Sequence, residues 1–513
     1  MMKLDRRFVR VLPMISSSPR GRRSLRVVCF GSVAVAALLS GCAVGPDFER
    51  PKPPEITGYT AEPLAPETAS AETKGGDAQR FVTDMDIPGQ WWTLFHSAAL
   101  NSLIEQSLKA NPDLKAAQAA LRGAMENLHA QQGAFFPQVQ AGFTPQRYKD
   151  ASQLSPTLST PATYFNLYSA QVSVSYPLDI WGGTRRAVES ARAQAEAQRY
   201  QLEATYLTLT SNVVAAALQE ASLKAQIAAT EAIIKLETES LVLSKKQLVL
   251  GQTSGGDVAA QEAALAQAQT TLPPLQKQLA QQRDLIAALA GRFPSDQPPQ
   301  TFDLAMLDLP KDVPVTLPAK LIEHRPDIRA AEENLHSASA EVGVAIANML
   351  PNLTLSATSG TSATQLSQLF QSGNGFWTIG SSLTQTVFDG GTLLAKKRAA
   401  DAGLDQAMAQ YESTTVTAFQ NVADALRALQ ADADAVKAGL AAERAADKSL
   451  QIARRQQQLG SISYLAMLNA EQTYQQAVIG LVQAQAGRYA DTAALFQALG
   501  GGWWNRADVA EAE

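Results

Sequence analysis

Residues 184–250 read TRRAVESARAQAEAQRYQLEATYLTLTSNVVAAALQEASLKAQIAATEAIIKLETESLVLSKKQLVL and contain neither proline nor glycine. At about 1.5 Å per residue, a helix of this length would extend roughly 100 Å, far more than a helix in an ordinary globular domain. A series of its apolar residues recurs at a spacing of seven residues, as the seam of a coiled coil requires. Only Glu220 interrupts this series, which consists of Tyr206, Val213, Ile227, Ile234, Leu241 and Leu248.

The sequence contains an internal duplication. Five short motifs recur in the same order, at spacings of 208 to 214 residues. One match would carry little weight, but five in one order indicate a duplicated unit. The matches are Asn111-Pro112-Asp113-Leu114 with Arg325-Pro326-Asp327-Ile328, Pro137 with Pro351, Gly182-Gly183-Thr184 with Gly390-Gly391-Thr392, Leu250-Gly251 with Leu459-Gly460, and Leu285 with Leu495.

Both units predict the same succession of elements. In the first, a helix from about Leu100 to Gly133 precedes a β-hairpin, a very long helix and a returning helix, in which Pro273-Pro274 should cause an interruption. The chain is expected to turn at Gly251 and Gly460. The predicted segments are a first repeat at 90–291 with its hairpin at 138–178 and long helix at 184–250, a linker at 292–317, a second repeat at 318–501 with its hairpin at 352–388 and long helix at 392–459, and a C-terminal tail at 502–513.

The hairpins are predicted from strict alternation. Leu353, Leu355 and Ala357 alternate with small polar residues, and Val172 and Val174 do the same in the first repeat. This spacing is typical of strands with one apolar and one polar face. A soluble β-sandwich alternates in the same way, so alternation alone leaves both architectures open.

The amino terminus predicts export. Eight basic residues precede an apolar run at 27–39, which is too short to span a bilayer as a helix, and residues 1–41 are typical of a signal peptide. Met14 is an alternative start, and Arg6-Arg7 leaves twin-arginine export open. Leu39-Ser40-Gly41-Cys42 resembles the bacterial lipoprotein box, which implies a lipid on Cys42. In this resemblance Ala43, in place of aspartate, implies sorting to the outer membrane, with residues 42–89 as a lipid-anchored extended tether.

Charge and cysteine content exclude several classes of protein. Removing a leader with eight basic residues and one acidic residue changes the formal charge from −5 to about −12, which disfavours a nucleic-acid partner. Only Cys29 and Cys42 are present, so the mature chain can form no internal disulfide. Its four histidines show no metal-ligand spacing, and no nucleophile elbow or phosphate loop occurs, so we expect no enzyme, no metal and no cofactor apart from the lipid.

Exported chains without a membrane-spanning helix can cross the outer membrane as closed barrels of strands. Two hairpins supply four strands, which cannot close around a pore. Small barrels of about eight strands are filled by their own side chains, so an open pore requires at least three copies and twelve strands. The expected fold class is mainly α with a membrane β-barrel.

The chain resembles the TolC-like outer-membrane efflux proteins, in particular the NodT-type lipoproteins of resistance-nodulation-division pumps. This resemblance implies a trimeric twelve-stranded β-barrel on a long α-helical periplasmic barrel, docked to a periplasmic adaptor and an inner-membrane pump. It covers nearly all of the mature chain and is carried by the paired motifs above together with Gln90-Trp91-Trp92, Leu178-Asp179-Ile180-Trp181-Gly182 and Val387-Phe388-Asp389-Gly390-Gly391.

The resemblance implies an exit duct that passes small toxic compounds from the periplasm to the exterior. Polypeptide secretion through a similar duct, or a trimeric fibrous adhesin, are the alternatives, and the cargo, pump and adaptor are left open. The predicted outward loops are 150–163 and 363–375. Asp179 and Asp389 are interpreted as helix caps.

The resemblance implies that the turns of the long helices form the periplasmic tip, which related ducts often close with aspartates and salt bridges. The second turn carries no acidic residue, so an apolar gate formed by Tyr464 and Leu465 is proposed, with packing of Tyr464 between helices as the alternative. The predicted adaptor-docking residues are Gly251, Ser254, Asp257, Gly460 and Ser463.

Overall fold

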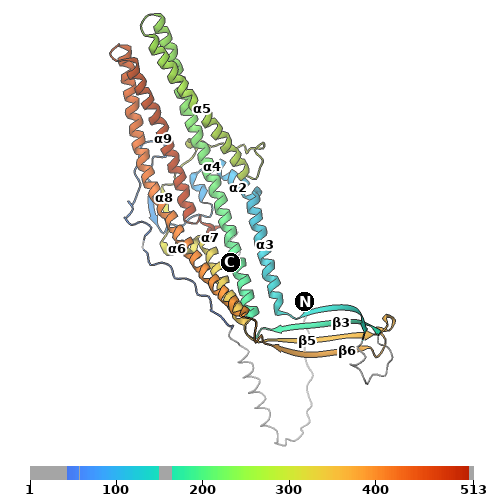
Figure 1. The fold of residues 1–513 in the computed structure, drawn as a ribbon. Coiled ribbons are helices and arrows are strands. Elements are labelled where there is room, and N and C mark those ends of the chain that lie inside the picture. Colours follow the sequence, from blue (N-terminus) through green and yellow to red (C-terminus); the bar gives the residue numbers. More distant parts are fainter. Residues whose placement is uncertain (1–42, 57, 150–163, 508–513) are drawn as a thin grey trace, which may run out of the picture. The chain divides into compact units, whose positions relative to one another are not determined.

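The computed structural model describes residues 43–56, 58–149 and 164–507 (Figure 1). The chain forms two compact units. We call the first the sheet unit; its described part is residues 43–45, 135–149, 164–186 and 343–395. The rest of the described chain forms the helical unit.

The two repeats have matching helix lengths. The long helices α4 (Gly183–Val249) and α8 (Thr392–Gln458) have 67 residues each, and the returning helices α5 (Gly255–Leu289) and α9 (Tyr464–Ala498) have 35 each. Within the helical unit, α4 and α5 form one antiparallel hairpin and α8 and α9 form another (Figure 1). At the two turns, Gly251 and Gly460 have φ of 72° and 71°, a left-handed conformation that glycine adopts without strain.

The first helix of each repeat is broken, contrary to the continuous helix predicted from Leu100 to Gly133. The first repeat has α2 (Ala98–Ala110) and α3 (Pro112–Gln132); the second has α6 (Pro318–His324) and α7 (Pro326–Ala347). The ring of a proline clashes with helical backbone at the preceding residue. Asn111 and Arg325 accordingly have extended ψ values of 127° and 118°, and each following proline starts a new helix.

The predicted interruption at Pro273-Pro274 is wrong. Both prolines lie inside the continuous helix α5. Their side chains are exposed, so the carbonyl oxygens that lose an N–H partner on that face can bond to water. The hydroxyls of Thr270 and Thr271 also donate to the carbonyls of Gln267 and Ala268, each at 2.7 Å, in the turn before the prolines.

The sheet unit contains one antiparallel sheet with the strand order β2-β3-β5-β6. Its strands are β2 (Gln138–Lys149), β3 (Tyr164–Leu178), β5 (Asn352–Ala363) and β6 (Gly375–Thr384). The second hairpin was predicted to reach residue 388, but β6 ends at Thr384. Thr384 pairs with Asn352, and the residue before Asn352 is Pro351, which has no N–H to continue the ladder.

In the core of the helical unit, the start of the first repeat and the end of the second pack against the inter-repeat linker. Trp91 stacks on Phe496 with ring centroids 5.5 Å apart, and both belong to one buried cluster with Phe302 and Leu307. The tether predicted up to residue 89 is not wholly irregular. It contains β1 (Arg80–Thr83), which pairs in parallel with β4 (Asp312–Val315) of the linker. Sequence alone could not pair two four-residue segments more than 200 residues apart.

Candidate membrane-spanning sheet and helical turns

Strand pairing gives the sheet two chemically different faces. Val139, Val174, Ala357 and Ile379 are aligned in one row across all four strands. The adjacent row, whose side chains point to the opposite face, contains Gln140, Ser173, Thr358 and Thr378. We call these the apolar face and the polar face. The duplicated hairpins therefore match in which face is apolar, although β2 and β3 have 12 and 15 residues and β5 and β6 have 12 and 10.

The apolar face has the height of a bilayer core. It extends over six rows, from Leu178 paired with Leu353 to Tyr168 paired with Ala363. At about 3.3 Å per residue these rows cover roughly 33 Å along the strands, or about 25 Å in height at the usual barrel tilt. Between these rows, the described strands place no charged residue on this face, whereas Arg147 and Lys149 follow beyond its outer end.

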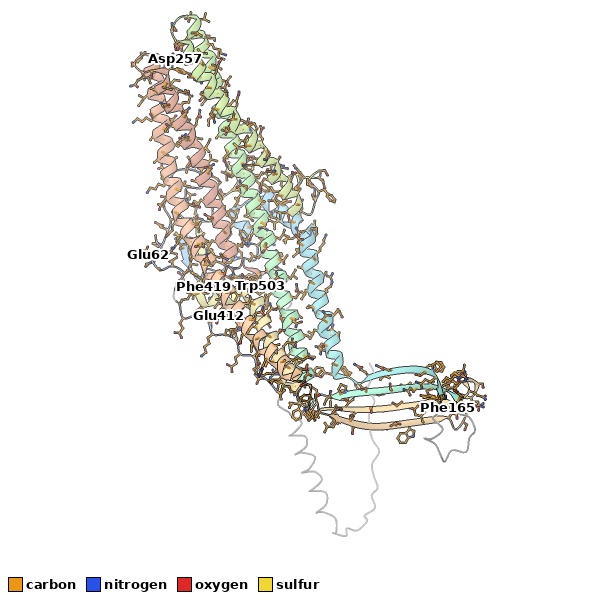
Figure 2. The ribbon with its side chains drawn as sticks, in the orientation of Figure 1. Glu62, Phe165, Asp257, Glu412, Phe419 and Trp503 are labelled. Carbon is orange, nitrogen blue, oxygen red and sulfur yellow. The ribbon has the colours of Figure 1, made fainter. Side chains whose placement is uncertain are left out.

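Aromatic residues lie towards the ends of this band. Tyr168 and Tyr176 are four rows apart on the apolar face of β3. Phe165 lies at the loop end of the hairpin (Figure 2). It belongs to the polar face, where Tyr148 stacks on it with ring centroids 5.3 Å apart. Tyrosine is enriched where a barrel meets the membrane surface, because its ring is apolar and its hydroxyl is polar.

Both edges of the sheet are open within one chain. The edge strands β2 and β6 have 12 and 10 residues, and among the described residues each pairs on one side only. In hydrocarbon, an unpaired backbone N–H or C=O costs several kcal/mol, so such a sheet needs strands from other copies. In a membrane, the four described strands of one chain would therefore have to form part of a larger closed barrel.

The sequence interpretation of Asp179 and Asp389 as helix caps is confirmed. The backbone N–H of Thr184 donates to Asp179 Oδ1 at 2.9 Å, and that of Leu393 donates to Asp389 Oδ2 at 2.7 Å. Each carboxylate thereby satisfies N–H groups at the start of a long helix. The sharp change of direction before each helix uses Gly182 and Gly390, with φ of 77° and 67°.

Three of the five predicted docking residues, Ser254, Asp257 and Ser463, cap the returning helices. Ser254 Oγ accepts from the Asp257 N–H at 3.1 Å, and the Asp257 carboxylate accepts from the Ser254 N–H at 3.1 Å, which makes a capping box. The Ser254 hydroxyl also donates to the Asp257 carboxylate at 2.8 Å, and this hydrogen bond, followed by that from the Ser254 N–H, lowers the pKa of Asp257. In the second turn, Ser463 Oγ accepts from the Ala466 N–H at 3.2 Å. Asp257 lies at the turn end of the α4–α5 hairpin (Figure 2).

The two predicted gate residues differ in exposure. Tyr464 is only 8% exposed and packs against Ala453 and Met467, and burial raises its pKa to about 12. Leu465 is 60% exposed. This geometry favours the packing alternative for Tyr464 and leaves Leu465 as the candidate for a constriction.

Sequence reasoning missed an apolar group at the turns. Val249, Leu250 and Leu459 are all strongly exposed, next to the two turn glycines. Two of them belong to the repeated Leu-Gly motif, whose recurrence is the signal that could have identified them.

The described residues contain no group of three or more histidine, cysteine, aspartate or glutamate side chains placed to hold a metal ion. No helix in the same part of the chain is both long and apolar enough to cross a membrane.

A family model described as outer membrane efflux protein matches residues 103–292 and 317–501. The toluene efflux pump outer membrane protein TtgF of Pseudomonas putida is 31% identical over 489 residues, covering 92% of this chain and 97% of that protein. The outer membrane protein OprJ of Pseudomonas aeruginosa is 27% identical, covering 93% and 97%. Among solved structures, the outer-membrane channel OprN is 29% identical with a TM-score of 0.79, covering 90% of this chain and all of that one. The outer membrane protein VceC of Vibrio cholerae is 28% identical with a TM-score of 0.75, covering 81% and 100%.

Proposed function

Because this chain belongs to the outer membrane efflux protein family, we propose that it is the exit duct of a tripartite efflux system, conducting small toxic compounds passively from the periplasm to the exterior. The observation that carries this proposal is the register of the sheet, which aligns one uncharged apolar face and one small polar face across four strands with two open edges. A lipid-facing wall and a water-facing wall are what a barrel pore requires. The comparisons give no support to polypeptide secretion.

Three copies would complete the barrel. Twelve strands enclose a water-filled lumen, whereas four or eight do not. In this arrangement β6 of one copy pairs with β2 of the next, and the glutamine, serine and threonine side chains of the polar face line the lumen. The proposed outward loops are 150–163, which lies outside the described residues, and 363–375, which contains the short helix η4 (Leu366–Gln368).

The proposed partners are a periplasmic adaptor and an inner-membrane resistance-nodulation-division pump. The adaptor would contact the helical turns, where the exposed Val249, Leu250 and Leu459 supply apolar contact area. Gly251, Gly460 and the capping residues determine the backbone conformation of these turns. Relatives are named for toluene, solvent and antibiotic efflux. For this chain we propose small organic compounds as the cargo class.

Purified protein reconstituted in a planar bilayer should give discrete, long-lived conductance steps. The reason is that the polar face of a completed barrel encloses water. An adhesin with the same helices would not conduct, so absence of steps from a correctly assembled trimer would contradict the duct.

Cys42 should carry a lipid on the mature amino terminus. Cys42 itself lies outside the described residues, but Val44 donates its N–H to the carbonyl of Trp181 at 3.0 Å, shortly after the end of β3. This hydrogen bond keeps the tether close to the Leu178 end of the apolar band, where an acyl chain could enter the bilayer. Intact mass spectrometry should show acylated Cys42 as the first residue, and the Cys42→Ser variant should lack that mass. An unmodified Cys42, or cleavage elsewhere, would contradict the prediction.

Leu465→Ala and Tyr464→Ala should have different effects. If the exposed Leu465 narrows the resting opening, the smaller side chain should raise single-channel conductance without lowering stability. Tyr464→Ala should instead destabilise the α8–α9 hairpin by about 2–4 kcal/mol, because it opens a cavity beside Ala453 and Met467. Thermal unfolding and bilayer recordings distinguish the two effects. A rise in conductance with Tyr464→Ala alone would restore Tyr464 as the gate.

A further inference from the structure

A buried polar cluster links the two helical hairpins in their turn-ward halves. Glu237 of α4 and Glu471 of α9 are each only 1% exposed. Glu237 accepts from the side-chain amide of Gln475 in α9 at 2.6 Å and from that of Gln261 in α5. Glu471 accepts from Arg454 of α8 at 2.7 Å. We call these five residues the hairpin cluster; it takes side chains from all four helices of the two hairpins.

The duplication shows which part of the cluster is additional. Aligning the two Leu-Gly turns matches the pair Arg454 and Glu471 with Lys245 and Glu262, which are 2.8 Å apart and about half exposed. This ion pair is therefore common to both hairpins. Three members of the cluster have only alanine at the equivalent position of the other repeat: Glu237 with Ala446, Gln261 with Ala470, and Gln475 with Ala266. These three residues make the cluster different from its counterpart.

The cluster is short of positive charge and of hydrogen-bond donors. It holds two buried carboxyl groups and one guanidinium. Glu471 Oε2 and Gln261 Oε1 are buried acceptors without a hydrogen-bond partner. One added proton on Glu237 improves the charge balance, because it leaves one carboxylate for the one guanidinium, and Gln475 can still donate to the protonated group. Consistently, burial and then the charge of Glu471 raise the pKa of Glu237, against the opposing effects of Gln475, Gln261 and Arg454.

We propose that Glu237 is a proton-binding site that couples the two hairpins, protonated while they pack together and ionised when they separate at the turns. This rests on the proposed duct, in which separation of the hairpins would open the periplasmic end. The groups that face Glu237 are Gln261 from α5, Arg454 from α8, and Gln475, Glu471 and Tyr464 from α9.

The direction of the pH effect follows from linkage. A carboxyl whose pKa is raised in the packed state stabilises packing at low pH, and this stabilisation is lost as the pH rises through the raised pKa. Separation exposes Glu237 to water and returns its pKa towards the ordinary value. Higher pH should therefore favour separated hairpins, by at most about tenfold per pH unit for one proton per protomer.

Glu237→Gln is the decisive variant, because glutamine has the shape of protonated glutamate and cannot ionise. Spin labels on cysteines replacing the exposed Gln252 and Ser461, in the full-length assembled protein, report the distance between the two turns. In the protein with Glu237 the separated population should grow between pH 5 and pH 8. In Glu237→Gln it should stay small, and the difference between the two isolates this group from others that titrate in that range.

Glu262→Gln is the matched control, since it neutralises the exposed carboxyl of the equivalent ion pair and should keep the full pH response. Gln475→Leu removes a donor to ionised Glu237 and should shift the midpoint to higher pH. A pH response unchanged in Glu237→Gln, or equally lost in Glu262→Gln, would overturn the proposal. The label distances do not depend on conduction, so a protein that fails to conduct in bilayers contradicts the duct and leaves this test readable.

Discussion

Arginine in place of Val174 should prevent assembly in the outer membrane, whereas arginine in place of the neighbouring Ser173 should be tolerated. Val174 lies in the middle of the apolar face, in a row with Val139, Ala357 and Ile379. An arginine that faces lipid at the bilayer midplane costs about 2–4 kcal/mol per strand, and a trimer carries that cost three times. Ser173 points to the polar face, where water can solvate the guanidinium.

The measurement is the fraction of each variant recovered from outer membranes as a trimer on unheated detergent gels. We expect near-complete loss for Val174→Arg and a level close to the parent protein for Ser173→Arg, which instead should alter conductance and ion selectivity. Equal recovery of the two variants, or loss of Ser173→Arg alone, would show that the faces are assigned the wrong way round.

Arg488→Ala should release the amino-terminal segment from the helical unit. Arg488 of α9 is fully buried, and its guanidinium donates to the carbonyl oxygen of Gly75 at 3.0 Å and to Thr68 Oγ1 at 2.9 Å. It also donates to the carbonyl of Asp77 and, at 3.4 Å, to Gln79 Oε1. The alanine variant would leave several buried acceptors without a donor, each costing about 1–3 kcal/mol, so we expect a loss of roughly 3–5 kcal/mol.

Hydrogen exchange and limited proteolysis of residues 66–79 test this expectation. Protection of that segment should be lost in Arg488→Ala, while the strand pairing of β1 should weaken with it because β1 begins at Arg80. The control is Arg444→Ala, which removes an exposed ion pair with Glu72 at 3.6 Å and should leave protection unchanged. If both variants behave alike, the segment is held by something other than Arg488.

The candidate site could be predicted in outline because its features are periodic in the sequence. The apolar and polar faces follow from alternation in segments such as Leu353 to Ala357, since side chains of a strand point to opposite faces in turn. The caps at Asp179 and Asp389 could also be predicted, because a capping side chain bonds to N–H groups only a few residues away. The ends of helices and strands were harder to predict. For example, β6 ends at Thr384 because its partner strand begins only after Pro351.

By itself, the sequence determined the duplicated unit, the very long helices and the alternating hairpins, because each is recorded as a repeat, a period or a local stop signal along the chain. Only the tertiary structure decided which of these residues are buried and which residues pack against them. Tyr464 and Leu465 are adjacent, yet one packs between helices and the other is exposed. Glu237 and Gln475 are 238 residues apart and meet only because two hairpins lie side by side. Such contacts depend on the packing of distant segments, and no local pattern in either segment encodes its partner.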